Sequence, residues 1–343
     1  MSLASKLKVK IIKKIEEISR EEWEGVYPET LENYYFFTSL HASSFHQFSF
    51  FYILVYENNT LLGCAPCFVM DFPLDSAVSG PLKLLFQVVN KALPKIINPK
   101  VLICGLPMGL GRIGLTGNST EVMEAICVGL EKIAGENKAS MIFFKDFTKA
   151  YEDRLKPLLS KGFSRIESFP STEMSISFSS FDDYTKTLSR ASRDGLKRNL
   201  KKADAGEKID LEAKDKLEGE ELSQVHGLYL QTYSKQELGF EKLPLDFFKN
   251  ISLNMPQETK YFLWRINGKL AAFALCLVAG DYFIDYYLGF DYALMDRYHL
   301  YFIRFRDLMK WCIAHGIKKY EMGVTSYESK RRLGFDFIRL YFY

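Results

Sequence analysis

Two stretches that lie far apart in the chain share a pattern of apolar runs broken by a short polar turn. Residues 52–69 contain an apolar run, a polar turn at 57–59 and a second apolar run. Residues 261–278 repeat this order around Asn267 and Gly268. Asn-Gly between apolar runs is a strong hairpin signal because the turn needs positive φ angles. The pattern therefore predicts one β-hairpin in each half of the chain.

A helix followed by a strand is predicted after each hairpin. Apolar residues recur at helical spacing over 121–136, and an apolar strand follows at 139–144. Residues 299–315 and 317–322 repeat this order in the second half. An additional stretch of the first half, 71–100, contains four prolines, which are typical of irregular structure.

Each half is predicted to close with a short helix, a Gly-Phe pair and a final strand. The pairs are Gly162-Phe163 and Gly334-Phe335, where glycine lets the helix end and the chain turn back. In the second half, residues 325–328 have the sequence of a capping box that begins the helix. The last strand is expected to continue to Tyr343.

The shared order predicts a duplicated α/β fold with mixed sheets. Helices that alternate with strands in this way pack on a central sheet. Residues 172–179 alternate apolar and polar side chains, so they are predicted to form the first strand of the second half. The expected domains are 1–170 and 171–343, which agrees with a prior of about two domains for 343 residues.

Composition and charge exclude several classes of protein. The chain is 48% hydrophobic and 25% charged, which is enough apolar surface for a folded core. A net charge of +3 argues against a protein that is basic throughout and binds nucleic acid over its whole surface. The longest apolar runs, 48–56 and 271–279, are shorter than the about 20 residues that a membrane helix needs. No signal-peptide pattern is visible and the six cysteines are scattered, so a cytoplasmic location is expected.

The spacing of Cys64 and Cys67 could indicate redox chemistry or a zinc site. Both cysteines lie in a predicted strand, where residues three apart point to opposite faces. The sequence contains no second pair of this spacing that would complete a four-ligand zinc site. We therefore expect buried, apolar cysteines and no bound metal ion.

Basic residues near the start of the second half are spaced by three and four positions, which places them on one face of a helix. They are Lys186, Arg190, Arg193, Lys197 and Lys201. Like charges at this spacing are unfavourable by about 0.2–0.5 kcal/mol per pair unless an anion is bound. Gly195 adds about 1 kcal/mol of cost inside a helix. The pattern favours a contact with phosphate, a nucleotide or tRNA over the alternative of a solvated face.

Three motifs of the second half resemble those of a known family. The basic segment 188–202 resembles that family's helix after the opening strand, and 286–291 resembles its strand end before the substrate loop. Residues 327–335 resemble its closing helix with a Tyr, Lys and Gly signature. The family is that of the FemAB-like transferases of peptidoglycan branching, a doubled version of the GNAT acyltransferase fold. The resemblance implies two tandem GNAT-like domains, each with a central mixed sheet flanked by helices, and an active site in the second.

The resemblance further implies an acyltransferase that acts on peptidoglycan precursors. It would move an activated acyl group from acyl-CoA, or an aminoacyl group, to an amine acceptor by direct attack in a ternary complex, without a metal ion. Two alternatives stay open. One is a peptidoglycan-branching transferase whose partner is aminoacyl-tRNA, and the other is a non-catalytic protein that binds an anion or a partner.

The glycine pattern bears on the use of coenzyme A. The Gly-x-Gly pyrophosphate loop of GNAT proteins has no counterpart at 289–299, which leaves coenzyme A open. The glycines at 105–112 precede another predicted strand, 112–116, whereas a phosphate loop directly precedes a helix. We therefore favour a turn at 105–112.

Candidate catalytic residues are Asp285, Lys330 and Tyr327. Asp285 lies in an aromatic strand, where a carboxylate is costly unless it is paired or functional. It could orient or deprotonate an attacking amine, or it could pair with Arg297 or Arg304. The resemblance implies that Lys330 stabilises negative charge at the acyl centre or binds a substrate phosphate. Tyr327, three residues earlier in the predicted helix, could supply a proton or pack in the core.

Candidate substrate-binding residues are Arg193, Lys197, Tyr286 and Arg297. Arg193 is chosen by its match to the family pattern, and Lys197 lies on the same basic face. Tyr286 belongs to the strand-end motif. Arg297 precedes a predicted helix whose first N–H groups could also bind an anion. The sequence assigns no residue to a cofactor.

Overall fold

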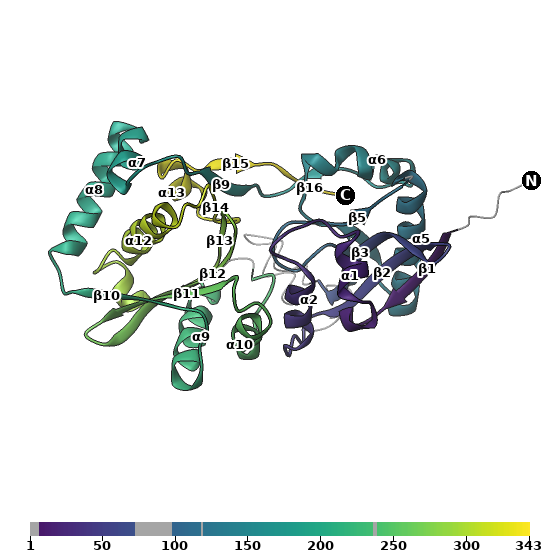
Figure 1. Ribbon diagram of the computed structural model, residues 1–343, viewed down its shortest axis with the longest axis horizontal. Helices are drawn as coiled ribbons and strands as arrows, with labels where there is room; N and C mark the ends of the chain where they lie inside the picture. Colours follow the sequence, from purple (N-terminus) through teal and green to yellow (C-terminus); the bar gives the residue numbers. More distant parts are fainter. Residues whose placement is uncertain (1–6, 73–97, 118, 236–238) are drawn as a thin grey trace, which may run out of the picture. The chain divides into compact units, whose positions relative to one another are not determined.

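The computed structural model describes residues 7–72, 98–117, 119–235 and 239–343 of the chain. Contacts divide the chain into two compact units (Figure 1). Unit 1 consists of Met1–Ser168, Glu237–Lys242 and Arg339–Tyr343, and unit 2 of Phe169–Gln236 and Leu243–Ile338. Most of the proline-containing stretch predicted to be irregular lies outside the described residues.

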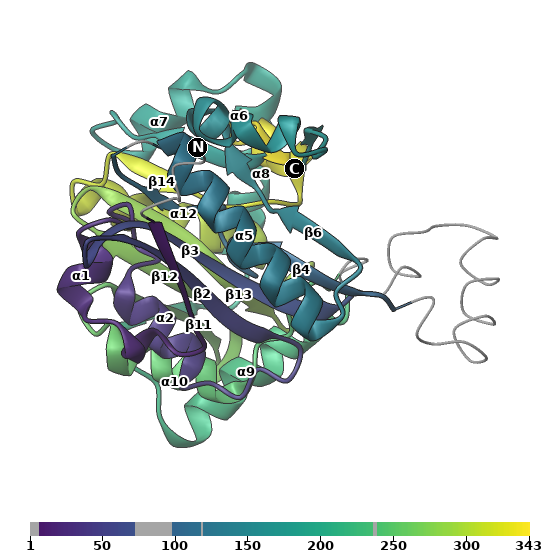
Figure 2. The same ribbon diagram turned by 90° about the vertical axis from the view of Figure 1, so that its right-hand side faces the viewer.

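Unit 1 is built on a mixed sheet with helices on both faces. Its strands follow the order β1 (Leu7–Ile12), β2 (Ser49–Glu57), β3 (Thr60–Asp71), β4 (Lys100–Cys104) and β6 (Met141–Phe144), with β5 (Gly114–Leu115) paired to β3. The long helix α5 (Ser119–Asn137) crosses one face (Figure 2) and shares a core with Ile53. On the other face, α1 (Arg20–Glu24) and α2 (Tyr34–His41) place Trp23 and Phe37 against Tyr52. Successive residues of β2 point to opposite faces, so one strand supplies both layers.

Unit 2 is built on a larger mixed sheet. Its strands follow the order β10 (Ile209–Lys214), β11 (Thr259–Ile266), β12 (Lys269–Ala279), β13 (Tyr282–Phe290), β14 (Lys319–Glu321), β9 (Ser171–Ser175) and β15 (Asp336–Ile338). One face carries α7 (Phe181–Thr187), α8 (Arg190–Asp204) and α12 (Leu300–Ala314), and the other carries α9 (Gly219–Tyr233) and α10 (Leu245–Asn254). The short helices α11 (Tyr292–Met295) and α13 (Tyr327–Arg332) follow β13 and β14.

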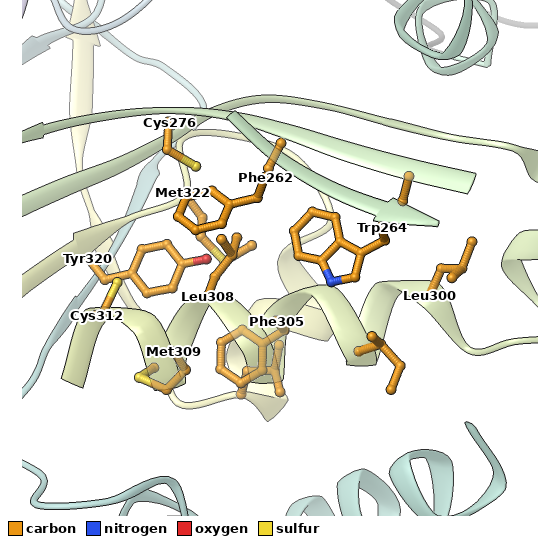
Figure 3. Close-up of a cluster of buried hydrophobic side chains, with 14 of the residues drawn as sticks. Phe262, Trp264, Cys276, Leu300, Phe305, Leu308, Met309, Cys312, Tyr320 and Met322 are labelled. Carbon is orange, nitrogen blue, oxygen red and sulfur yellow. The ribbon is translucent and has the colours of Figure 1, made fainter. Parts of the chain in front are cut away.

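The core of unit 2 lies between α12 and the sheet. Figure 3 shows Leu308 of α12 in one layer with Phe262 and Trp264 of β11. Tyr320 of β14 lies in the same layer, and its ring is fully buried. This packing fixes β13, β14 and α12 relative to one another, and these three elements carry most of the candidate site.

The parallel strands β13 and β14 pair over only part of their length. Pairing joins Tyr282–Ile284 to Lys319–Glu321, and β13 then continues to Phe290 without β14 beside it. On its other side, β13 stays paired to β12, with a register shift that makes Tyr286 an extra residue opposite Leu275 and Cys276. Such bulges turn a strand and occur preferentially next to active sites. The sheet therefore opens at Asp285.

The predicted hairpins and helix–strand units are confirmed. β2 pairs with β3 and β11 with β12, and Asn267 and Gly268 adopt the positive φ angles of 49° and 76° that the turn requires. The units α5–β6 and α12–β14 follow in the predicted order. The local sequence signals are sufficient here because each element is strongly patterned.

The sequence predicts one closing strand for the second half. This prediction is wrong in one respect, because the segment forms two strands, one in each unit. β15 pairs with β9 in unit 2. β16 (Leu340–Phe342) instead pairs in unit 1 with β7 (Phe147–Thr148) and β8 (Ile166–Glu167). Between β7 and β8 lie η3 (Lys149–Tyr151) and α6 (Glu152–Ser160). The backbone of Tyr343 exchanges two hydrogen bonds with Phe144. The Tyr343 side chain is buried in the core of unit 1, which explains why the chain end returns there.

Three further local predictions are wrong. The five basic residues do not share one helix, because Lys186 lies in α7 and Ser189 begins α8 by accepting the backbone N–H of Ser192. The capping box at 325–328 does not form, since Ser326 is left-handed and its side chain caps no N–H group. The first strand of the second half also ends earlier than predicted, at Ser175.

Candidate active site

A cluster of buried polar residues lies where β13 and β14 part. Asp285 is the first residue of β13 beyond the last pair, Ile284 with Glu321. The cluster also contains Arg304 of α12 and Lys330 of α13. Lys330 lies close enough to Asp285 and Arg304 for their charges to act on its pKa. Charged groups inside a core need partners. Their partners therefore define what the site can do.

Asp285 and Arg304 form a fully buried ion pair, with 1% of each side chain exposed. Nη1 and Nη2 of Arg304 donate to Oδ2 of Asp285 at 2.5 and 2.6 Å, and the Tyr320 hydroxyl donates to the same oxygen at 3.1 Å. Of the two partners expected from the sequence, Arg304 is therefore the one observed. Oδ1 of Asp285 is buried without a hydrogen-bond partner among the described residues. Burial raises the pKa of Asp285, and the Arg304 charge opposes that shift.

The side chain of Lys330 in α13 is buried against the loop that follows β14. Its Nζ donates to the carbonyl oxygens of Met322, Gly323 and Val324 at 2.8, 3.0 and 3.1 Å. An ammonium group has three N–H donors, so all of them are engaged. Burial lowers the pKa of Lys330 to about 8, while the charge of Asp285 opposes this shift. Lys330 therefore holds the loop in place beside Asp285.

The loop held by Lys330 has an unusual backbone. Thr325 and Ser326 adopt φ angles of 78° and 52°, and Gly323 adopts 60°. A left-handed conformation is unfavourable for residues with a side chain and persists where the surroundings impose it, often at functional sites. The three hydrogen bonds from Lys330 supply such a restraint.

Glu321 is a member of the cluster that sequence reasoning missed. It is buried at the end of β14 and accepts hydrogen bonds from the Ser171 hydroxyl at 3.0 Å and from the Tyr282 hydroxyl. The negative charge of Glu321 also raises the pKa of Lys330, which favours its charged ammonium form. The sequence contains the same signal for Glu321 as for Asp285, which is a carboxylate inside a predicted strand. Its partners come from other strands and could not be read from the sequence.

Two tyrosines of the predicted site have different surroundings. The Tyr327 hydroxyl donates to the carbonyl of Pro170 at 3.0 Å, and its ring lies 5.6 Å from that of Phe337. This is a packing role of the kind expected as the alternative. Tyr286 lies at the bulge of β13 with its ring 5.2 Å from Tyr287. It is the candidate residue nearest in sequence to Asp285.

The predicted anion-binding arginines lie apart from Asp285. Arg297 is exposed, with Nη2 3.6 Å from Glu207 and its guanidinium over the Tyr298 ring. Arg193 is half-buried on α8 and donates to the carbonyl of Lys186 at 3.5 Å. Neither hydrogen-bonds to the buried cluster.

Lys197 lines a separate depression of about 530 Å³ between α7, α8 and α12, which we call the basic hollow. Its charged lining residues are Lys197, Lys201, Arg306, Lys310, Asp182 and Asp204. Arg304 points from α12 toward Asp285, whereas Arg306 is hydrogen-bonded to Asp204 of α8. The basic hollow and the buried cluster therefore use different sides of α12.

The glycine-containing loop of unit 1 is explained by packing. A side chain at Gly111 would place its Cβ 2.1 Å from the Lys145 carbonyl oxygen, and at Gly114 2.4 Å from that of Val26. The strand β5 follows this loop before the helix α5 begins. This agrees with the predicted turn. Within the described ranges, no helix combines the length and apolar composition needed to cross a membrane.

Solved structures similar to the whole chain share little sequence with it. FemX is 14% identical, with 97% of this chain and 96% of that chain covered and a TM-score of 0.58. L-PGS from Bacillus licheniformis is 11% identical, with 96% and 90% covered and a TM-score of 0.54. A tandem GNAT protein from the clavulanic acid biosynthesis pathway, solved without AcCoA, is 9% identical, with 98% and 97% covered and a TM-score of 0.54. These likenesses show the fold, which is a tandem of two GNAT-like domains.

The sequence itself gives the family. No curated protein sequence matches the chain. The model of the FemAB-like family, described as one of peptidoglycan biosynthesis and recognition, matches residues 98–341. The match begins just before β4, includes the hairpin of β11 and β12, and covers every candidate site residue. The chain therefore belongs to the FemAB-like family.

Proposed function

We propose that unit 2 transfers an acyl or aminoacyl group to an amine where β13 and β14 part. As a FemAB-like protein, the chain is a peptidoglycan-related acyl or aminoacyl transferase. The observation that carries the placement of the site is Asp285, whose Oδ1 is buried without a partner among the described residues just beyond the last strand pair. A buried acceptor of this kind is suited to receive a hydrogen bond from an amine.

The proposed reaction is a direct attack. The amine nitrogen bonds to the acyl carbonyl carbon, the bond from that carbon to the thiol or ribose oxygen of the donor breaks, and one amine proton leaves. Asp285 orients the amine and takes that proton, for which a raised pKa is favourable. The leaving thiolate or alkoxide takes up the proton that Asp285 accepted, so that the products are an amide and a thiol or alcohol and Asp285 returns to the carboxylate. Attack on a thioester or an ester needs no metal ion, so the proposal includes none.

Lys330 and Tyr327 have supporting roles in this proposal. Lys330 keeps the 322–326 loop in place beside Asp285, and its positive charge favours negative charge at the acyl centre. Tyr327 fixes the start of α13 through its hydrogen bond to Pro170. Tyr286, at the bulge, contacts the acceptor. Arg193, Lys197 and Arg297 bind anionic parts of the substrates away from the reacting atoms.

Acyl-CoA and aminoacyl-tRNA are both candidate donors, with the amine of a peptidoglycan precursor as acceptor. Both donors are made in the cytoplasm, where we place the reaction. The tandem GNAT architecture favours acyl-CoA. Exposed cations on α7 and α8 favour the second candidate function, an aminoacyl-tRNA-dependent branching transferase, because phosphate contacts supply most of the affinity for nucleic acid.

The test is a transfer assay with labelled donors. Acetyl-CoA and alanyl-tRNA are each mixed with a lysine-containing cell-wall precursor peptide, and the product mass is measured. Asp285→Asn should lower transfer by about 100-fold or more, while Asp281→Asn, an exposed carboxylate at the same hairpin, should retain it. Equal transfer by both variants contradicts the site. No transfer by the wild type from either donor contradicts the proposed donors.

A further inference from the structure

The basic hollow carries positive charge on the opposite side of α12 from the buried cluster. Residues of an α-helix follow one another by about 100°, which places Arg306 and Lys310 about 200° and 240° around the axis from Arg304. Arg304 faces Asp285, and Arg306 and Lys310 line the basic hollow. A ligand in the basic hollow therefore cannot touch the proposed reacting atoms through α12.

Three ammonium groups in the basic hollow have no carboxylate within ion-pair distance in the part of the chain that the structure describes. They are Lys197, Lys201 and Lys310. The charge of Arg306 is already matched, because it donates to Asp204 at 2.7 Å and to Asp307 at 2.9 Å. The remaining lining carboxylate, Asp182, lies in the first turn of α7, where the helix end favours it.

Several other lysines of unit 2 are paired with carboxylates. Lys214 lies 2.8 Å from Glu221, Lys260 2.5 Å from Asp215, and Lys319 2.6 Å from Glu173. The basic hollow instead gathers like charges from two helices. Such a gathering is unfavourable in the free protein and becomes favourable when an anion is bound.

The shape of the basic hollow fits a small anionic group with an organic part. Its volume of about 530 Å³ falls within the range of small-molecule sites. Lys197 and Lys201 are one helical turn apart, so their Cβ atoms are separated by about 5–6 Å. Lys310 reaches in from α12 and lies over the ring of Phe181, which with Leu200 gives the basic hollow an apolar wall.

We propose that the basic hollow binds a ligand that carries two adjacent phosphate groups, at a site separate from the transfer centre. The three ammonium groups without a carboxylate partner carry more positive charge than a single phosphate monoester offsets, because its charge is only about −1.5 to −2. A small diphosphate ester and the backbone of an RNA chain share this chemistry. The proposal extends the proposed function, since it states what Lys197 binds. It needs no turnover for its test.

The test is a calorimetric titration with inorganic pyrophosphate and with orthophosphate at low salt. The wild type should bind pyrophosphate more tightly than orthophosphate. The triple variant Lys197→Gln, Lys201→Gln and Lys310→Gln should lose affinity by about tenfold or more, because charge-assisted hydrogen bonds are lost. A matched control removes three exposed cations outside the basic hollow, by Lys186→Gln, Arg198→Gln and Lys202→Gln. It should change affinity by less than about threefold, since exposed charges at a distance are screened.

Further arms identify the source of the phosphates. A short single-stranded RNA that competes with pyrophosphate and is lost in the triple variant indicates an RNA backbone, whereas pyrophosphate binding without RNA binding indicates a small diphosphate ester. The proposal is overturned if the wild type binds no pyrophosphate, if the control loses as much affinity as the triple variant, or if only anionic lipid vesicles bind. Because no acyl donor is present, a failed titration and a failed transfer assay remain distinguishable.

Discussion

The two units share a fold, but the corresponding pairs of parallel strands differ in how far they stay paired. In unit 1, the parallel strands β4 and β6 stay paired to their ends, from Val101 with Met141 to Cys104 with Phe144. The backbone of Tyr343 then exchanges two hydrogen bonds with that of Phe144, the last residue of β6. In unit 2, β13 leaves β14 after Ile284 and continues alone on that side. The duplication therefore has one closed copy and one open copy, and the open copy carries the candidate site.

The two units also differ in how closely their buried carboxylate and arginine are paired. In unit 1, Glu32 is buried with Nε of Arg112 3.7 Å away and the Thr30 hydroxyl donating at 2.7 Å. In unit 2, Asp285 receives both terminal nitrogens of Arg304 on one oxygen. The second carboxylate oxygen of Asp285 is buried without a hydrogen-bond partner among the described residues. The comparison teaches that a buried carboxylate becomes a candidate for catalysis when its strand is also open.

The largest expected effect on stability comes from breaking the ion pair of Asp285 and Arg304, compared with that of Glu32 and Arg112. Arg304→Met leaves Asp285 buried without its main partner and should lower the free energy of unfolding by about 3–5 kcal/mol. Arg112→Met should cost less, because Arg112 is more exposed and more distant from its partner. Urea unfolding of both variants measures the difference. A larger loss for Arg112→Met would reverse the comparison.

The next effect tests the closure of unit 1 by the chain end. Tyr343→Ala removes a side chain from the core of unit 1 and should lower the free energy of unfolding by about 3 kcal/mol. Phe342→Ala is the control, because Phe342, the preceding residue and the last of β16, is only partly buried. Thermal unfolding followed by circular dichroism compares them. Equal losses would mean that the chain end is not specifically packed.

A smaller effect concerns the charge of Lys330 and depends on pH. Burial lowers its pKa from 10.5 to about 8 in the folded chain, so between these values the unfolded chain binds more protons. The free energy of unfolding of the wild type should therefore rise with pH in this window, by about 2–3 kcal/mol relative to Lys330→Met. Urea unfolding at pH values on either side of the window measures it. Parallel curves for the two proteins would show that Lys330 is not buried.

The smallest effect concerns Gly195 in α8. A Cβ at this position would meet nothing within 4 Å, so packing does not require glycine. Gly195→Ala should raise the free energy of unfolding by about 1 kcal/mol through helix propensity. Gly111→Ala in unit 1 should lower it, because the added carbon would overlap the Lys145 carbonyl. The same sign for both variants would contradict this account of the glycines.

Much of the fold could be predicted from the sequence because its signals are local. Asn267 and Gly268 determine a turn, and the apolar spacing of residues 299–315 determines a helix. The exchange of the last strand could not be predicted, since it depends on the space in unit 1 that Tyr343 fills. The break between α7 and α8 carried a signal in Ser189, which is a preferred residue at a helix start.

The candidate site was predictable in part for the same reason. Asp285 could be identified because a carboxylate is unexpected inside an aromatic strand. The engagement of Lys330 by three carbonyl groups depends on where β14 ends, and the role of Glu321 depends on its neighbours in the sheet. Such contacts are set by tertiary packing. They required the structure.

The measurement that tests the central claim most directly compares the two units at constant charge. Asp285→Asn with Arg304→Met removes the pair of unit 2, and Glu32→Gln with Arg112→Met removes that of unit 1, so neither double variant leaves a buried charge unpaired. Transfer to the precursor peptide is measured per folded molecule. We predict a loss of about 100-fold or more for the pair of unit 2 and less than about threefold for the pair of unit 1. Equal transfer by the two double variants would contradict a catalytic site in the open copy.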